Sequence, residues 1–328
     1  MKVLIASPRL RRMVSRLKEM IPPHIELVVS KTRSDEELIS LASDVEVIVC
    51  VRLSAEVARA AKHLRLIQKT GAGVDAIPFD VLSDDVFVAN TSGANPVPLA
   101  EGIVALLLAL AKQIVPRHNS FKRKEIKRSQ GIELRGKKVG IIGLGHIGRE
   151  VARFLQSFEM QILAIKRHPD EALKTKLSLD FLGEPKDLEF ILQESDFIIV
   201  IVPLTPETRG MIGERELGLM KQTAYIINVA RAAITQEKPL FKALKEGCIA
   251  GAALDVWWPP HWWDSKWNMN GTLPLCPFWE LPNVIATPHN IGSTDISSDI
   301  SLKIIAENIV RVAEGKSPIN QVDKNLQY

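Results

Sequence analysis

The chain has 328 residues, enough for two domains that each bury a core of their own. Apolar residues make up 46% of the sequence and charged residues 24%, so a disordered or fibrous chain is excluded. The formal net charge of +4 is too small to indicate a nucleic-acid or membrane partner, and we expect neither.

The cysteines and the apolar segments indicate the cellular setting. Cys50, Cys248 and Cys276 are too scattered for a disulfide framework, and their spacing fits no zinc site. The N-terminus lacks the pattern of a signal peptide, and the longest apolar run, 103–111, is about half the length of a membrane span. We therefore expect a cytoplasmic protein with no metal site.

Short apolar runs and amphipathic segments alternate along the first part of the chain. The pattern predicts strands at 2–6, 25–29, 45–50, 66–69 and 86–89, and helices at 9–20, 35–42 and 55–61. Such alternation is typical of a parallel sheet covered by helices on both faces. The segment 90–98, with Gly93, Pro96 and Pro98, then interrupts the pattern and predicts a hinge.

The alternation resumes after a long apolar helix predicted at 99–114. The basic stretch 117–128 that follows is interpreted as a solvated helix face rather than a phosphate-binding patch. Further strands are predicted at 138–142, 161–166, 197–202, 224–229, 250–256 and 284–287, and a last helix at 299–314. The fold class is therefore α/β, with two doubly wound parallel-sheet domains.

A glycine-rich turn joins the strand predicted at 138–142 to the next helix. Its pattern is Gly143-x-Gly145-x-x-Gly148, and the strand before it and the helix after it make the pattern informative. In a dinucleotide-binding fold the first glycine forms the turn, the second admits the pyrophosphate and the third lets helix and strand approach closely. The helix N-terminus then offers amides to the phosphates.

The end of the strand predicted at 161–166 indicates which dinucleotide binds. NAD-specific folds place Asp or Glu there to accept a hydrogen bond from the 2′-hydroxyl of the ribose. Here Lys166 and Arg167 occupy this place, and the first carboxylate is Asp170. Two cations favour a 2′-phosphate, so NADP(H) is preferred over NAD(H). The alternative interpretation is that both are surface charges.

Motifs along most of the chain resemble those of the D-2-hydroxyacid dehydrogenase family, which includes glyoxylate/hydroxypyruvate reductases, phosphoglycerate dehydrogenases and formate dehydrogenases. They are GAGVDAI, NPVPLAEGIVALLLAL, GLGHIG, VPLTPETRGMI, INVARAAI, GAALDVW and TPHNIG. The resemblance implies a Rossmann cofactor domain, 99–290, inserted in a flavodoxin-like substrate domain, 1–98 plus 291–328. It also implies a homodimer formed through the cofactor domains.

The resemblance assigns roles to individual residues. Arg231 would hold the carboxylate and carbonyl of the substrate, and His289 would be the general acid in ketoacid reduction. Leu53 would line the substrate pocket, and Ala72 and Gly73 would donate backbone amides to the carboxylate. The cofactor would lie along a larger set, with Asp255 at the nicotinamide carboxamide: Leu99, Gly143, Gly145, His146, Ile147, Gly148, Lys166, Arg167, Val202, Pro203, Thr208, Val229, Ala230, Asp255 and Gly292.

The sequence departs from the family at one catalytic position. Relatives carry a Glu five residues after the Asp of the LDV motif, where it supports the imidazolium, whereas this chain has Pro260. Asp264 or Glu280 could replace it. All six tryptophans lie between Trp257 and Trp279, in a stretch interpreted either as a self-packed loop or as an aromatic lid or dimer contact.

The leading interpretation is an NADP(H)-dependent reductase of small 2-ketoacids, with glyoxylate or hydroxypyruvate favoured. The alternatives are an enzyme similar to 3-phosphoglycerate or formate dehydrogenase, and a non-catalytic nucleotide sensor similar to the corepressor branch of the family. The presence of both Arg231 and His289 argues against the sensor.

Overall fold

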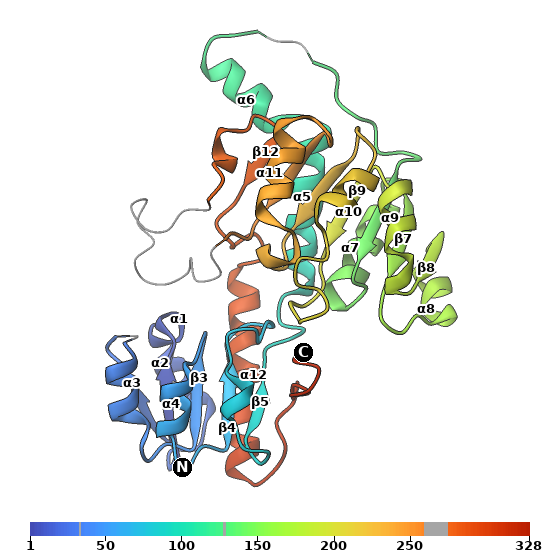
Figure 1. Cartoon of the computed structure of the whole chain (residues 1–328). Helices are drawn as coiled ribbons and strands as arrows, with labels where there is room; N and C mark the ends of the chain where they lie inside the picture. Colours follow the sequence, from blue (N-terminus) through green and yellow to red (C-terminus); the bar gives the residue numbers. More distant parts are fainter. Residues whose placement is uncertain (33, 127–128, 259–274) are drawn as a thin grey trace. The chain divides into compact units, whose positions relative to one another are not determined.

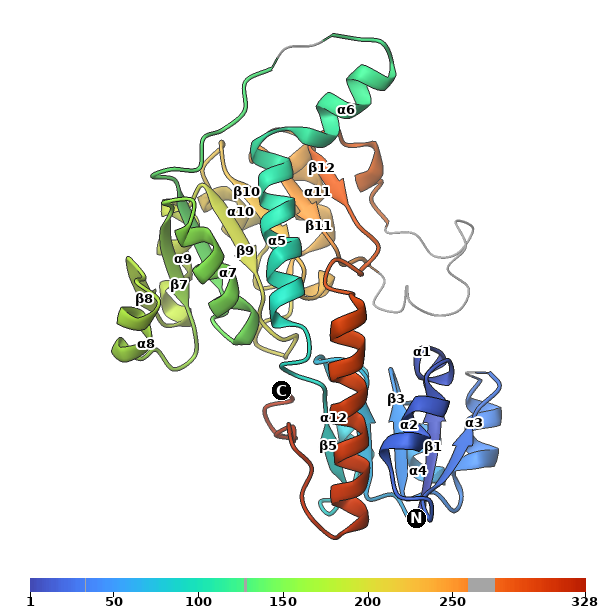
Figure 2. The ribbon, with the colours of Figure 1, turned by 180° about the vertical axis from the view of Figure 1, so that it is seen from behind.

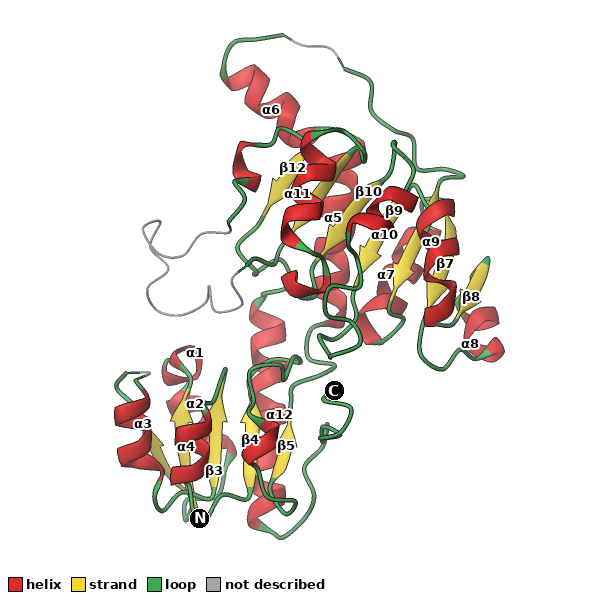
Figure 3. Cartoon of the chain, viewed as in Figure 1, coloured by secondary structure: helices red, strands yellow, loops and turns green. Residues whose placement is uncertain are grey.

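The computed structural model describes residues 1–32, 34–126, 129–258 and 275–328. Contacts divide the chain into two compact units, the first comprising Met1–Asn95 and Thr294–Tyr328 and the second Pro96–Ser293. Each unit consists of strands flanked by helices (Figure 3). The chain passes from one unit to the other at 95/96 and again at 293/294. The domain boundaries expected from the sequence, 98/99 and 290/291, each lie three residues from these positions.

The first unit contains a sheet that, within the described residues, has five strands in the order β2-β1-β3-β4-β5. All of its pairings are parallel. Its strands are β1 (Lys2–Ala6), β2 (Glu26–Val29), β3 (Val47–Cys50), β4 (Leu66–Lys69) and β5 (Phe87–Ala89). This order is the flavodoxin-like one expected from the sequence.

Helices cover both faces of this sheet (Figure 1). One face packs against α3 and α4, and the other against α1, α2 and α12. The helices of the unit are α1 (Pro8–Arg11), α2 (Val14–Met20), α3 (Asp35–Ala42), α4 (Ala55–Ala60), the short 3-10 helix η1 (Phe79–Val81) and α12 (Asp295–Ala313).

The C-terminal segment belongs to the core of the first unit. Leu302, Ile305 and Ile309 of α12 are buried against the sheet. Buried Asn308 donates a hydrogen bond of 2.7 Å from Nδ2 to the side-chain oxygen of Gln68 on β4. On the other face, burial raises the pKa of the Cys50 thiol to about 11, so Cys50 packs as a small apolar side chain.

The second unit contains a larger parallel sheet. Within the described residues it has seven strands in the order β12-β11-β10-β9-β6-β7-β8. They are β6 (Lys138–Ile142), β7 (Gln161–Ile165), β8 (Phe181–Gly183), β9 (Phe197–Val200), β10 (Tyr225–Asn228), β11 (Gly251–Leu254) and β12 (Val284–Ala286). The order extends the Rossmann arrangement, in which the strand sequence reverses between β6 and β9. The expected fold class is confirmed.

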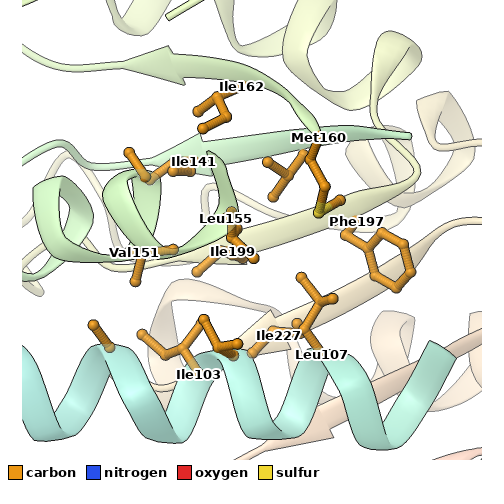
Figure 4. Packing of buried hydrophobic residues seen from close by; sticks show 14 of the residues in the cluster. Ile103, Leu107, Ile141, Val151, Leu155, Met160, Ile162, Phe197, Ile199 and Ile227 are labelled. Carbon is orange, nitrogen blue, oxygen red and sulfur yellow. The ribbon is translucent and has the colours of Figure 1, made fainter. Parts of the chain in front are cut away.

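Two sets of helices bury the faces of the larger sheet. α5, α7 and α8 cover one face (Figure 2), and α9, α10 and α11 cover the other (Figure 1). In the core beneath α5, α7 and α8, Ile103 and Leu107 of α5 point toward Ile227 and Phe197 of the sheet (Figure 4). These helices are α5 (Pro96–Ala111), α7 (His146–Gln156), α8 (Glu171–Lys176), α9 (Leu188–Glu194), α10 (Glu214–Leu219) and α11 (Glu237–Lys245).

The remaining helices of the second unit are α6 (Ile114–Lys122) and the short 3-10 helices η2 (Pro185–Asp187), η3 (Ala232–Ile234) and η4 (Phe278–Glu280). α6 is largely exposed, in agreement with a solvated face for this part of the basic stretch. Among the described residues no single helix meets the criteria for a membrane span, and α5 and α6 meet them only as a pair bent by 61°.

Several predicted helix boundaries were wrong for local reasons. The helix predicted at 9–20 is divided into α1 and α2 at Arg12 and Met13. The segment 90–98, interpreted as a hinge, contains the boundary between the two units after Asn95, and its last three residues form the start of α5. Pro96 and Pro98 are tolerated there because first-turn amides lack helical acceptors. The chain turns at Gln113, which has a left-handed φ of 53°, and this ends the helix predicted at 99–114 early.

Candidate functional site

The candidate residues of the second unit lie at one edge of its sheet. The glycine turn follows β6, Lys166 and Arg167 follow β7, and the segment 201–210 follows β9. Arg231, Asp255 and His289 follow β10, β11 and β12 in turn. Because all these strands are parallel, their carboxyl ends meet at a single edge, where open α/β sheets bind ligands.

The three glycines of the β6–α7 turn have different surroundings. Gly143 has a φ of +109°, which favours glycine, and a Cβ there would lie 2.7 Å from the carbonyl oxygen of Ile201. A Cβ on Gly148 would collide with the carbonyl oxygen of Gly143. A Cβ on Gly145 would meet nothing within 4 Å. Two glycines therefore serve the packing of the turn, and the third faces open space.

The first turn of α7 suits an anionic ligand. Gly145 is its N-cap residue, so no side chain caps the helix, and none of its first-turn residues, all of them described, is acidic. By contrast, α3 begins with Asp35, Glu36 and Glu37. The α7 amides are thus left to a ligand, and the glycine turn leaves room for a pyrophosphate. His146 is exposed beside it, whereas Ile147 packs against the core beneath.

The end of β7 presents two basic residues. The Lys166 amide donates a hydrogen bond of 3.0 Å to the Gly183 carbonyl, which extends the ladder with β8. Arg167 forms an ion pair of 2.8 Å with Glu207, in the segment after β9. The carboxylate of Asp170 accepts a hydrogen bond of 3.0 Å from the Ala172 amide and caps α8. The first carboxylate after β7 is therefore used as a helix cap within the protein.

The segment after β9 is held by its threonines. Thr208 Oγ1 donates to the Pro203 carbonyl at 2.6 Å and accepts from the Thr205 amide at 2.8 Å. Val202 lies beside the glycine turn, since its Cγ1 would be 3.0 Å from a Cβ on Gly143. The structure thus brings Val202 and Gly143 together, as the sequence implied for residues along one cofactor, and gives Thr208 a role in holding the loop.

Arg231 is presented by a fixed turn at the end of β10. Fully buried Asn228 accepts a hydrogen bond of 3.1 Å from the Ala230 amide and donates one of 3.1 Å to the Arg231 carbonyl. Val229, which follows Asn228, is also buried. One guanidinium nitrogen of Arg231 donates to the Ala230 carbonyl at 2.8 Å. Sequence reasoning missed Asn228, although an Asn that ends an apolar strand signals a buried polar group needing partners.

Asp255 holds the segment that carries His289. The carboxylate of Asp255, which is only 3% exposed, accepts hydrogen bonds from the Thr287 hydroxyl at 2.6 Å and the Asn290 amide at 3.2 Å. It also accepts one from the Ile291 amide at 3.4 Å. Sequence reasoning assigned Asp255 to the cofactor and missed this structural function and its partners.

The side chain of His289 has a defined orientation. His289 has a left-handed φ of 55°, and its Nδ1 lies 3.1 Å from the Asp255 carbonyl oxygen. A carbonyl can only accept, so this contact requires a proton on Nδ1. The exposed imidazole can therefore exchange a proton with a substrate at Nε2.

Other predicted residues are brought together within each unit. In the second unit, a Cβ on Gly292 would lie 2.9 Å from Leu99 Cβ, so this segment packs on α5. In the first unit, the Leu53 amide donates to the Ala76 carbonyl at 3.1 Å, which joins the loop after β3 to the loop with Ala72 and Gly73. The amides of these last two residues donate to no partner among the described residues.

The two ends of the tryptophan-rich stretch pack together. Phe278 is fully buried and contacts Trp257, Trp258 and Phe241. Trp257 Nε1 also donates to the Thr287 carbonyl at 2.9 Å. Pro260 and Asp264 lie outside the described residues, as do the tryptophans at positions 262, 263 and 267. Glu280, the other suggested replacement for the missing Glu, is exposed in η4.

Comparisons with known proteins agree with this geometry. The family described as "D-isomer specific 2-hydroxyacid dehydrogenase, NAD binding domain" matches residues 104–290. A glyoxylate reductase of Aeropyrum pernix is 34% identical over 93% of this chain and 88% of its own. A D-3-phosphoglycerate dehydrogenase of Archaeoglobus fulgidus is 36% identical over 98% of this chain, which spans only 59% of that longer protein.

A solved structure resembles the whole chain. The D-lactate dehydrogenase of Aquifex aeolicus, complexed with NAD and lactic acid, superimposes with a TM-score of 0.86 at 26% identity and covers 96% of each chain. Together with the sequence matches, this shows that the chain belongs to the D-isomer specific 2-hydroxyacid dehydrogenase family.

Proposed function

We propose that the chain is a cytoplasmic NADP(H)-dependent reductase of small 2-ketoacids, with glyoxylate or hydroxypyruvate as its substrate. This proposal rests on one observation: a glycine turn with open space at Gly145, the two basic residues Lys166 and Arg167, and the side chains of Arg231 and His289 follow strands that end at one sheet edge. The side chain of Asp170, the first carboxylate after β7, caps α8, which favours a coenzyme with a 2′-phosphate.

The chemistry follows from the side chains that the sheet edge presents. NADPH bound at this edge would supply the hydride that reduces the carbonyl carbon of the substrate. The guanidinium of Arg231 can hold the substrate carboxylate through its forked N–H groups while polarising the carbonyl. His289 gives a proton from Nε2 to the developing alkoxide, and its Nδ1 contact with Asp255 keeps the ring oriented.

A turnover assay tests this function directly. Glyoxylate and hydroxypyruvate with NADPH should give rapid coenzyme oxidation. Turnover of 3-phosphoglycerate or formate with NAD(P)⁺, and none of the ketoacids, would instead assign the enzyme to another branch. Tight coenzyme binding with no turnover of any of the four compounds would identify a sensor and contradict the proposal.

Two glycine substitutions distinguish ligand contact from packing in the coenzyme site. Gly145→Ala should weaken coenzyme binding at least about 10-fold, because the added methyl group stands where the pyrophosphate approaches, yet leave the melting temperature unchanged. Gly148→Ala should lower the stability by about 1–3 kcal/mol, because its methyl group collides with backbone. Coenzyme titration and thermal melts of the free protein measure both effects. Equal behaviour of the two variants would contradict this division.

Asp255→Asn tests how the His289 segment is held. The amide cannot accept hydrogen bonds on both sides, so at least one donor among Thr287, Asn290 and Ile291 loses its partner. Because hydrogen bonds to charged groups contribute about 1.5–3 kcal/mol, we expect a comparable loss of stability and a lower kcat. Thr287→Val, which removes one donor only, is the control and should have the smaller effect. Unchanged kcat in Asp255→Asn would contradict this role.

A homodimer formed through the cofactor domains is part of the proposal. It is supported by apolar side chains exposed on and after α6, where Phe121 is 75% exposed and Ile126 is 83% exposed. A second copy of the chain would cover them. Light scattering should give twice the chain mass, and Phe121→Asp should shift it toward the monomer. A monomeric unaltered protein would refute the dimer.

A further inference from the structure

The ion pair between Arg167 and Glu207 links two loops at the proposed coenzyme site. Arg167 follows β7 and is 33% exposed, whereas Glu207 lies in the loop after β9 and is 75% exposed. The two charged groups approach to 2.8 Å. The guanidinium proposed to bind a 2′-phosphate is therefore bound to a carboxylate of the protein itself.

The loop that carries Glu207 is fixed by hydrogen bonds on both sides of this residue. The Thr208 amide donates to the Thr205 carbonyl at 3.2 Å, and the Arg209 amide donates to the same carbonyl at 3.0 Å. Thr208 Oγ1 binds the Pro203 carbonyl, as described above. Because the backbone of Glu207 is held in a turn, rotation of its side chain can separate the carboxylate from Arg167 while the loop stays in place.

Other described carboxylates near the end of β7 have different partners. Asp170 caps α8, Glu171 lies 3.9 Å from Lys174, and Glu184 pairs with Lys186 at 2.8 Å. Among these, Glu207 is the carboxylate that the structure brings to Arg167. A phosphate bound by the same guanidinium would compete with it and would be repelled by it, since like charges a few ångströms apart destabilise each other.

We propose that Glu207 sets the coenzyme selectivity by opposing the 2′-phosphate at Arg167. This rests on the proposed function, in which Lys166 and Arg167 bind that phosphate. NADP(H) must displace the Glu207 carboxylate, whereas NAD(H), which has a hydroxyl there, leaves the ion pair in place. Glu207 therefore lowers the preference for NADP(H) below the level that the two cations alone would give.

The test compares ligands that differ only in the 2′-phosphate. Binding of NADPH and NADH is measured by fluorescence titration, and that of 2′,5′-ADP and 5′-AMP by calorimetry. Glu207→Gln should tighten binding of NADPH and 2′,5′-ADP by about 3- to 10-fold, since an exposed ion pair is weak and repulsion adds to it. Binding of NADH and 5′-AMP should stay within about twofold.

A matched variant controls for net charge. Glu214 is paired with Lys242 at 2.8 Å between α10 and α11, so Glu214→Gln makes the same charge change away from the loop after β7. It should leave all four affinities unchanged. In Arg167→Ala, the further substitution Glu207→Gln should bring less gain than in the unaltered protein, because the guanidinium for which the two anions compete is gone.

The outcomes distinguish this proposal from the coenzyme preference on which it rests. Equal affinity for 2′,5′-ADP and 5′-AMP, unaffected by Arg167→Ala, would refute the preference itself and Glu207 with it. Loss of 2′,5′-ADP binding in Arg167→Ala, together with unchanged or weaker binding in Glu207→Gln, would leave the preference intact and overturn the role of Glu207.

Discussion

His289→Asn should lower kcat for ketoacid reduction by about 10²- to 10⁴-fold, the range typical of a lost general acid. Asn is the appropriate replacement because His289 has a left-handed φ of 55°, which Asn adopts more easily than Ala. The local backbone conformation is then preserved, while the imidazole, with its proton donor and its contact with the Asp255 carbonyl, is lost. Stopped-flow reduction with saturating coenzyme and substrate measures this effect.

Coenzyme affinity and pH dependence are the controls for this variant. The dissociation constant of NADPH should change little, because the glycine turn and the residues after β7 are untouched. Reduction by the unaltered protein should fall as pH rises and the imidazole loses its proton, whereas the residual activity of His289→Asn should lack this decline. A variant with kcat within about tenfold of the unaltered protein would exclude His289 as the acid.

Replacing Lys166 by Asp and Arg167 by Ala together should reverse the coenzyme preference. Loss of a bidentate phosphate contact and of a neighbouring charge should cost about 2–4 kcal/mol of NADPH binding, or roughly 30- to 1000-fold. The introduced Asp can accept a hydrogen bond from the 2′-hydroxyl of NADH, so NADH binding should be kept or improved. The ratio of kcat/KM values for the two coenzymes is the measurement.

A charge control belongs with this double variant. Lys186→Asp changes a nearby exposed lysine that pairs with Glu184, and it should leave the coenzyme ratio unaltered. Unchanged NADPH binding in the double variant would show that Lys166 and Arg167 do not bind the phosphate. The double variant should keep its fold, because neither Lys166 nor Arg167 belongs to the two apolar cores of the second unit.

The regular alternation of strands and helices made the two parallel sheets predictable. Some short strands and helix ends were not predictable, because they depend on local features of the chain. β8 was missed because its sequence is FLG, which lacks the Val or Ile that marks the equally short β5 and β12 and ends in glycine. Pro96 and Pro98 were interpreted as a break between regular elements, because the sequence alone does not distinguish a proline that begins a helix from one that ends it. Most other strands were found because both faces of each sheet are buried, which makes the strands short, continuous apolar runs.

The candidate site was predictable where motifs are local and unpredictable where contacts join distant segments. The glycine turn follows from six consecutive positions beyond β6 and needs no distant partner. The hydrogen bonds from Thr287, Asn290 and Ile291 to Asp255 join residues more than thirty positions apart. The ion pair between Arg167 and Glu207 is likewise formed across two loops, and sequence spacing does not signal it.

The division of the first unit between the two ends of the chain has a consequence for biosynthesis. Its strands leave the ribosome first, yet the face bearing Val3, Val47 and Leu66, which α1 and α2 bury in part, is completed by α12, which is made after Pro96–Ser293. At a synthesis rate of about 5–20 residues per second, the part of this apolar face that α12 buries stays exposed for roughly 10 to 40 s. The second unit, which is continuous in sequence, can fold during that interval. Newly made chains should therefore depend on chaperones through the first unit.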